Sequence, residues 1–204
     1  MTDRPVPERL PVPEQELDLR TRAVESLLVE KRLISTDAID RVVQAYEQDI
    51  GPMLGAGVVA KAWSDPAFKK LLLEDATQAC NSLGISGLRG EYLKAVESTS
   101  DEHHVVVCTL CSCYPWAVLG LPPTWYKQPA YRSQIVKQPR RVLREDFGLE
   151  LDEDVRITVW DSSSEARYFV VPERPPGTDK MTEAELTELV TRDSMIGVAK
   201  VMAP

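Results

Sequence analysis

Three of the four cysteines in the chain fall within six positions, at Cys108, Cys111 and Cys113. They follow the β-branched run 105–107, which predicts a short buried strand, and Pro115 prevents the hydrogen-bond ladder of that strand from continuing. The thiols are therefore expected on a tight turn at a strand end. Clustered soft thiolates select cobalt, iron, zinc or copper(I) over hard cations such as magnesium or calcium.

The spacing of these cysteines does not fit the common metal sites. A zinc site pairs Cys-x-x-Cys with a second pair of ligands, yet Cys80 stands apart and the chain has only two histidines, His103 and His104. Ferredoxin clusters need four cysteines at other spacings. The alternative to a metal site is a disulfide or a few buried thiols, and a bridge between Cys111 and Cys113 would close a very strained ring.

The backbone between Cys111 and Cys113 would lie across a metal that is held by three sulfurs. The deprotonated amides of Ser112 and Cys113 can then supply two further donors. Such a claw suits a small trivalent ion and leaves one axial position open. A trivalent metal with an open position can act as a Lewis acid or acidify a bound water.

The cysteine segment resembles the metal claw of the nitrile hydratase α subunit, a motif shared with the related thiocyanate hydrolase. The claw residues are Cys108-Thr109-Leu110-Cys111-Ser112-Cys113, and they stand between residues 103–107 and Tyr114-Pro115-Trp116. The resemblance covers nearly the whole chain. Its other matching segments are residues 58–63, 119–123, 131–133, 159–167 and 194–198.

The resemblance implies one low-spin Co³⁺ per chain, with metal ligands from Cys108, Cys111, Ser112 and Cys113. Cobalt is favoured over iron because the cobalt branch of the family carries threonine where Thr109 stands. The resemblance also implies a sulfinate at Cys111, a sulfenate at Cys113 and an unmodified thiolate at Cys108. The implied reaction is the hydration of a nitrile to an amide, without an acyl-enzyme.

The same resemblance implies the roles of the residues around the claw. Cys113, Ser112 and Arg167 are the expected catalytic residues. The histidine pair is expected to hold the shape of the claw, and Asp161, Glu165 and Arg167 to form a hydrogen-bonded network; a hairpin loop is the alternative interpretation of residues 161–165. The full set expected to support the claw is His103, His104, Thr109, Tyr114, Trp116, Arg132, Asp161, Glu165 and Arg89.

The implied partners are a nitrile hydratase β subunit, or split β-type chains, and a small-molecule nitrile. A cobalt-delivering activator protein is a further candidate partner. Arg89 stands where the family usually has glutamine, and it keeps open a three-subunit form that acts on a large nucleoside nitrile. Two other hypotheses remain: the cobalt subunit (γ) of a thiocyanate hydrolase, and a non-catalytic protein that binds or transfers metal.

The charge and hydropathy of the sequence limit which other kinds of partner are expected. The 204 residues include 24 basic and 32 acidic ones, for a net charge of −8. No stripe of lysine and arginine stands out, so no nucleic acid partner is expected. No apolar run reaches membrane-spanning length and no signal-peptide core is visible at the start, so we expect no membrane partner and a cytoplasmic location.

The expected fold class is α+β, with a helical N-terminal arm followed by a layered α/β/α metal-binding domain. Residues 1–16 are expected to be an extended proline-rich arm, 17–94 a helical region and 95–204 the metal-binding catalytic domain. Strands are expected at residues 105–107, 155–160 and 168–171. Helices are expected at residues 17–34, 39–50, 55–63, 66–84, 131–147 with a kink or break at Pro139, and from Thr182 onward behind a capping box with Glu185.

Overall fold

The computed structural model describes residues 14–44, 52–85, 92–110 and 113–203. The chain divides into two compact units, Met1–Tyr46 and Glu47–Pro204. The boundaries predicted from sequence, after residues 16 and 94, remain predictions.

In the described part of the first unit, residues 14–44, the chain forms the helices α1 (Glu14–Glu30) and α2 (Thr36–Gln44). Helix α1 begins three residues before the expected start, directly after the last proline of the N-terminal stretch. The Ser35 side chain accepts a hydrogen bond from the Ala38 backbone N–H, as expected for a cap. Several large apolar side chains of this unit are exposed, namely Leu19, Val24, Leu27, Leu33, Val42 and Val43.

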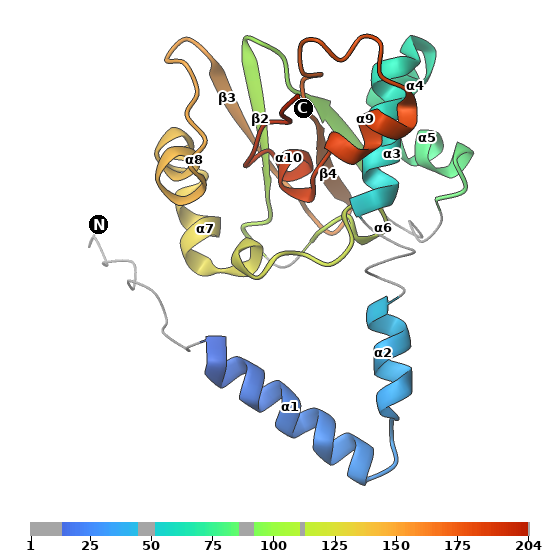
Figure 1. The fold of residues 1–204 in the computed structure, drawn as a ribbon. Helices are drawn as coiled ribbons and strands as arrows, with labels where there is room; N and C mark the ends of the chain where they lie inside the picture. The colour runs from blue at the N-terminus through green and yellow to red at the C-terminus, as the bar shows by residue number, and fades with distance from the viewer. Residues whose placement is uncertain (1–13, 45–51, 86–91, 111–112, 204) are drawn as a thin grey trace, which may run out of the picture. The chain divides into compact units, whose positions relative to one another are not determined.

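Among its described residues, the second unit contains four short strands and a series of short helices (Figure 1). Its strands are β1 (Tyr92–Glu97), β2 (Glu102–Val107), β3 (Arg156–Asp161) and β4 (Ala166–Val171). Its helices are α3 (Pro52–Ser64), α4 (Pro66–Glu74), α5 (Ala76–Ser82), α6 (Trp116–Leu119), the 3₁₀ helix η2 (Thr124–Lys127), α7 (Pro129–Gln134), α8 (Pro139–Phe147), α9 (Glu183–Leu189) and α10 (Arg192–Ile196). This mixture confirms the α+β class.

The strands pair in parallel, β1 with β4 and β2 with β3. Strand β2 also contacts β4, so the two pairs adjoin. Because β3 and β4 pair with different strands, the interpretation of residues 161–165 as a hairpin loop is wrong. Parallel pairing is consistent with apolar strands whose neighbours are helices, since such strands are buried on both faces.

The register of the strands brings four strand ends together. Val107 at the end of β2 is paired with Asp161 at the end of β3. Tyr92 at the start of β1 is paired with Ala166 at the start of β4, and its N–H donates to the Glu165 carbonyl at 2.8 Å. The cysteine segment leaves β2 at this edge of the strands.

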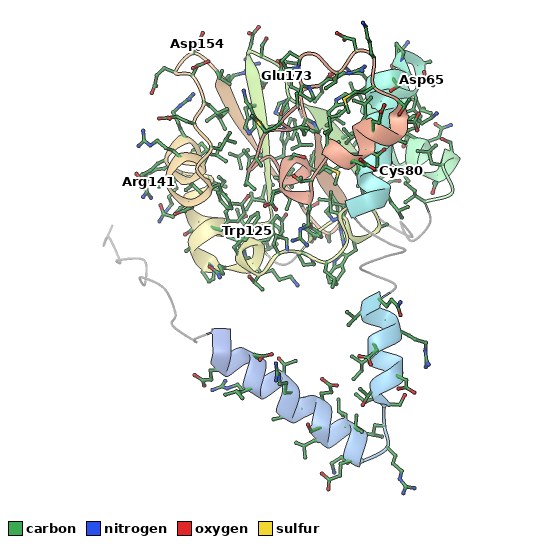
Figure 2. The ribbon with its side chains drawn as sticks, viewed as in Figure 1. Asp65, Cys80, Trp125, Arg141, Asp154 and Glu173 are labelled. Atoms are coloured by element: carbon green, nitrogen blue, oxygen red, sulfur yellow. The ribbon has the colours of Figure 1, made fainter. Side chains whose placement is uncertain are left out.

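Helices cover the strands and complete one hydrophobic core. Helices α4 and α5 contact β1, α8 contacts β3, and α10 contacts both β4 and β2. Cys80 on α5, labelled in Figure 2, is fully buried, and burial raises the pKa of its thiol to about 12. Cys80 therefore packs as a small buried apolar residue.

The expected helix over residues 66–84 is two helices. Asp65 caps α4 and Asp75 caps α5, each through side-chain bonds to backbone N–H groups of the first turn (Asp65 is labelled in Figure 2). Residues 131–147 likewise divide into α7 and α8, and Pro139 stands at the first position of α8. The capping box of Thr182 with Glu185 is confirmed.

One strand was not predicted from sequence, and one placement was wrong. Strand β1 was not expected, and several glycines precede it in the sequence. His103 and His104 do not precede the strand but lie within β2. The strand therefore begins three residues before the valine run.

Gly197, at the C-terminal end of α10, provides a test of this packing. Its φ is +90°, and a Cβ built there would lie 2.0 Å from the His104 carbonyl oxygen. We expect Gly197→Ala to lower the free energy of unfolding by about 3 kcal/mol or more. The strain of a positive φ and the clash of the new Cβ with the His104 backbone both contribute to this loss. Gly84→Ala is the matched control, because Gly84 has a φ of +74° with no described atom within 4 Å. Urea unfolding should give about 1 kcal/mol for the control; equal losses would contradict the packing described here.

Candidate metal centre

The two described cysteines of the claw are buried directly beyond the end of β2. Cys108 is 1% exposed and Cys113 is 6% exposed, whereas Leu110 between them is 88% exposed. Cys111 and Ser112 lie outside the described residues, as does Arg89. Among the described residues, which do not include Cys111, no three His, Cys, Asp or Glu side chains form a group that could hold a metal ion.

Asp161 binds the first turn of the claw through both of its carboxylate oxygens. Oδ1 accepts from the Thr109 backbone N–H at 2.9 Å, and Oδ2 accepts from the Thr109 hydroxyl at 2.5 Å. The register of β2 with β3 makes this possible, because it places Asp161 opposite Val107. The structure thus joins two residues that are 52 positions apart in the chain.

Arg132 holds the same turn from the other side. It lies in the last turn of α7, a helix that begins at Pro129. Its Nε donates to the Cys108 carbonyl at 2.8 Å and its Nη2 to the Thr109 carbonyl at 2.6 Å. The planar guanidinium fork suits two adjacent acceptors of this kind. The Arg132 side chain is therefore bound to this turn at two points.

The far end of the claw is held by two further side chains. Arg167 on β4 donates from Nη1 to the Tyr114 carbonyl at 3.0 Å. The Tyr126 hydroxyl of η2 donates to the Cys113 carbonyl at 3.4 Å. Carbonyl oxygens on both sides of residues 110–112 are therefore bound by side chains from other elements.

Two of the residues that touch this region were not predicted from sequence. Tyr126 is 1% exposed and Ser162 is 2% exposed. Ser162 lies in segment 159–167, which is one of the segments that carry the resemblance. The serine itself was not predicted to act at the site. Tyr126 follows a proline-rich loop, and nothing local in the sequence indicates that its hydroxyl reaches Cys113.

The remaining predicted residues lie around these contacts. Tyr114 is fully buried, its ring meets Trp116 edge-on at 6.4 Å between centroids, and Lys127 lies over the Trp116 ring. Glu165 is exposed. Its backbone carbonyl accepts a hydrogen bond from the backbone N–H at the start of β1. Glu165 is thus placed at the strand edge mainly through its backbone.

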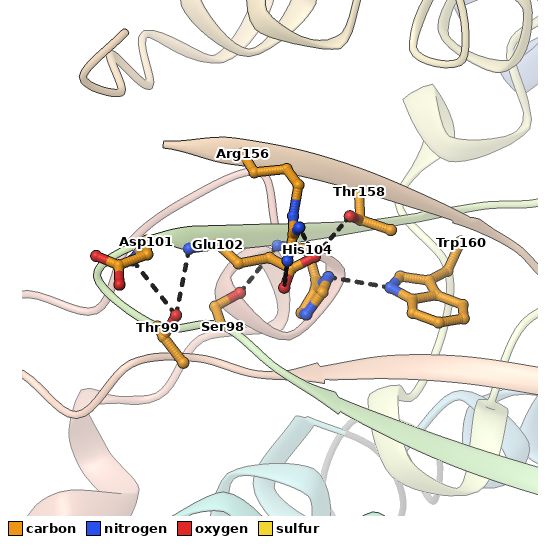
Figure 3. Close-up of polar contacts among 8 residues, drawn as sticks. All are labelled: Ser98, Thr99, Asp101, Glu102, His104, Arg156, Thr158 and Trp160. Carbon is orange, nitrogen blue, oxygen red and sulfur yellow. Dashed lines mark hydrogen bonds and ion pairs between the residues drawn. The ribbon is translucent and has the colours of Figure 1, made fainter. Parts of the chain in front are cut away.

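The two histidines tie β2 to its neighbours near the start of the strand. His103 Nε2 lies 2.8 Å from the Gly197 carbonyl oxygen. His104 Nδ1 accepts from the Trp160 indole N–H at 3.1 Å, beside the ion pair of Glu102 with Arg156 (Figure 3). Burial is the main cause that lowers the pKa of both imidazoles, although hydrogen bonds to backbone carbonyls oppose it.

Two hollows lie away from the claw, where β1 and β4 end. Their volumes are about 470 and 420 Å³, and they share Ser98, Thr99, Glu173 and Arg174 in their linings. Glu173, labelled in Figure 2, follows β4. None of the described claw residues, 108–110 and 113, lines either hollow.

Comparisons with known proteins identify the family of the chain. Residues 15–199 match the family model described as nitrile hydratase, alpha chain. The chain is 58% identical to a nitrile hydratase subunit alpha from Rhodococcus, over 94% of this chain and 96% of the relative. It is 57% identical to the cobalt-containing nitrile hydratase subunit alpha from Pseudonocardia thermophila, over 91% of each chain.

More distant relatives share the fold. The chain is 44% identical to the thiocyanate hydrolase subunit gamma from Thiobacillus thioparus, over 90% of this chain and 79% of the relative. A solved structure of a double mutant of the Fe-type nitrile hydratase from Comamonas testosteroni matches with a TM-score of 0.81 and 39% identity, over 94% of this chain and 93% of the other. The buried cysteine turn and these matches place the chain in the class of proteins that bind a metal through a cysteine-rich turn. The chain belongs to the nitrile hydratase α-chain family.

The buried histidines predict a specific pH dependence of stability. Their pKa values lie below the ordinary 6.5 in the folded chain, so the unfolded chain binds more protons once the pH falls below about 6.5. Stability is then lost as the pH falls from 6.5 toward the folded pKa values. We expect urea unfolding at a series of pH values to show this loss in the wild type and a smaller loss in the double variant His103→Gln/His104→Gln.

The carboxyl of Glu102, whose pKa is lowered from 4.5 mainly by its hydrogen bond with Arg156, contributes to the pH dependence of stability only at lower pH. Identical curves above pH 5 would contradict this account.

Proposed function

We propose that this chain is the catalytic, cobalt-binding subunit of a nitrile hydratase. The observation that carries the proposal is the buried turn of Cys108 and Cys113, whose flanking carbonyls are held by side chains of three other elements. The relatives that cover nearly the whole chain include subunits named cobalt-containing nitrile hydratase. The hydration of nitriles to amides is the activity that this family and this site support together.

The residues present fit a trivalent metal with sulfur donors. Cys108, Cys111 and Cys113 would hold cobalt through sulfur, and the backbone amides of Ser112 and Cys113 would be two further ligands. Soft sulfur ligands in a buried turn match the chemistry of such a metal. The side-chain bonds to the neighbouring carbonyls restrict the turn before any metal binds, which lowers the ordering cost of binding.

When bound, the cobalt would supply Lewis acidity toward a nitrile or a water. The chain's own residues would position and polarise that centre. Cys111 as sulfinate and Cys113 as sulfenate would carry negative charge, and Cys113 would be a candidate nucleophile. The cations of Arg132 and Arg167, which bind carbonyls beside the claw, would offset part of that charge. The Ser112 hydroxyl would bind water or substrate.

The choice of cobalt rests on the relatives and on Thr109. Several of the similar α subunits are named as cobalt-containing. A solved relative with a TM-score of 0.81 is of the Fe type, so the fold itself does not select the metal. Thr109 donates from both N–H and hydroxyl to Asp161, and a serine could make the same two bonds.

The proposed partners are a β subunit, or split β-type chains, and a cobalt-delivering activator. The exposed apolar side chains of α1 and α2 and the exposed Leu110 support a heteromer, because such groups are usually covered in an assembly. A cytoplasmic location is part of the proposal. Among the described helices none has the length and apolarity to cross a membrane.

The proposal is tested by producing the chain with a β-type subunit in medium that contains cobalt. About one cobalt per chain is expected, with oxygen added at Cys111 and Cys113 in the intact mass and amide formed from a nitrile. Cys108→Ala, Cys111→Ala and Cys113→Ala should each lose cobalt and activity, whereas Cys80→Ala should keep both. Thiocyanate turnover without nitrile turnover would support the sister enzyme instead. Tight metal binding without turnover of either substrate would support a metal-transfer protein.

Arg132 offers a more selective prediction. Arg132→Ala removes two donors from the Cys108 and Thr109 carbonyls. We expect cobalt retention against a chelator, or kcat, to fall by about 10- to 100-fold, as is typical for residues that orient metal ligands. Arg141→Ala is the matched control, because Arg141 lies on the exposed side of α8 and pairs with Glu145. Equal effects of the two variants would show that Arg132 does not act on the claw.

A further inference from the structure

We propose that Gly55 is a positioning residue for the part of the chain that leaves the claw. Gly55 lies on α3, and its lack of a side chain allows α6 to pack directly against that helix (Figure 1). Helix α6 begins three residues after Cys113, so its position sets the exit of the chain from the claw. The inference rests on the proposed function, since this position affects catalysis only if the claw binds the metal.

No side chain larger than hydrogen fits at residue 55. A Cβ built there would lie 2.4 Å from the Val118 carbonyl oxygen of α6. It would also lie 2.8 Å from the Met195 Sδ of α10 and 2.9 Å from the Val118 Cγ1. Carbon atoms in contact are normally separated by about 3.5–4.0 Å, so a methyl group here would displace the backbone of a neighbouring helix.

Gly57 shows that this close approach is specific to residue 55. Gly57 lies on the same helix, and a Cβ built there would meet no described atom within 4 Å. Glycine in the interior of a helix destabilises that helix relative to alanine. At residue 55 this loss accompanies a contact of three helices, since α3 packs against both α6 and α10.

Helix α6 is the element that would move if this contact became crowded. Helix α3 has 13 residues and also packs against α4 and α9, whereas α6 has four residues. The longer helix is therefore held from several sides. A methyl group at residue 55 would displace α6 from α3.

Backbone hydrogen bonds transmit such a displacement toward the claw. The Val118 N–H donates to the Pro115 carbonyl at 3.0 Å. The Trp116 N–H donates to the Tyr114 carbonyl, also at 3.0 Å. Because Tyr114 follows Cys113 directly, the compact turn of these residues joins α6 to the claw.

This turn is held on both sides by arginines. Arg167 donates to the Tyr114 carbonyl at 3.0 Å, and Arg192 of α10 donates to the Leu121 carbonyl at 2.8 Å. Because both sides are held, a displacement of α6 changes the backbone torsions between them. Trp116, whose half-buried ring packs edge-on against Tyr114, lies in this part of the chain and moves with α6.

The test compares Gly55→Ala with the wild type in the cobalt-loaded assembly with its β-type subunit. We expect kcat to fall by about 10- to 100-fold, because a misplacement of about 1 Å that originates far from the reacting atoms can have an effect of that size. The sulfur-to-cobalt absorption band should shift as well, because the geometry of the ligands changes. A loss of stability without a change in kcat or in the band would overturn the proposal.

Gly57→Ala is the matched control, since it is the same substitution in the same helix. It should raise the midpoint of urea unfolding, because alanine favours the helix. It should change kcat by less than about twofold, as is usual for substitutions that create no clash, and should leave the absorption band in place. Equal losses of kcat in the two variants would overturn the proposal.

A second pair of variants tests the proposal if Gly55→Ala is too crowded to assemble. Met195→Ala makes room for a methyl group at residue 55 but leaves the Val118 carbonyl where it is. Gly55→Ala/Met195→Ala should therefore keep the loss of kcat and the band shift, relative to Met195→Ala alone. Recovery of both would overturn the proposal, because crowding of a side chain and not the position of α6 would then be the cause.

A metal-free measurement separates this inference from the function on which it rests. The N–H groups of residues 118–120 donate to the Pro115 and Trp116 carbonyls. In the metal-free assembly their hydrogen exchange should be faster by about tenfold or more in Gly55→Ala, and unchanged in Gly57→Ala. Unchanged exchange in Gly55→Ala would overturn the inference. Faster exchange, in an assembly whose wild type neither binds cobalt nor hydrates nitriles, would refute the proposed function and leave the role of Gly55 in placing α6.

Discussion

The parallel pairing of β2 with β3 is the constraint on which the rest of the site depends. It sets Val107 opposite Asp161, so that the two strands end at the same edge. From there the Asp161 carboxylate reaches Thr109, and the Ser162 N–H reaches the Val107 carbonyl. A slip of one residue would turn every side chain of β3 to the opposite face and remove both bonds. Hydrogen bonds to a charged group contribute about 1.5–3 kcal/mol each, so the register and the claw stabilise one another.

The claw is shaped mainly through its carbonyl groups. Arg132, Arg167 and Tyr126 donate to carbonyls on both sides of residues 110–112. Such bonds fix peptide planes and leave the sulfur atoms and amide nitrogens of the turn to other partners. The two arginines also place positive charge beside a turn that is proposed to carry anionic sulfurs. The hydrogen bonds of the two arginines therefore orient the backbone of the turn and also bring positive charge beside it.

The sequence allowed much of this site to be predicted, and the limits have physical causes. The cysteine spacing identified the turn, and the valine run identified the strand before it. Strand β1 was missed because the glycines before it suggested a loop, and the pairing that makes it a strand is with β4, more than 70 residues away. Tyr126 and Ser162 were missed for the same reason, because their contacts arise from strand register and a 3₁₀ helix rather than from a local pattern.

The most direct test of the central claim is cobalt K-edge X-ray absorption on the assembled protein. The account predicts low-spin Co³⁺ with three sulfur neighbours and nitrogen donors, and a sulfur count that falls when Cys108, Cys111 or Cys113 is replaced. A cobalt surrounded only by nitrogen and oxygen would contradict the account, because the buried turn beyond β2 would then not be the metal site.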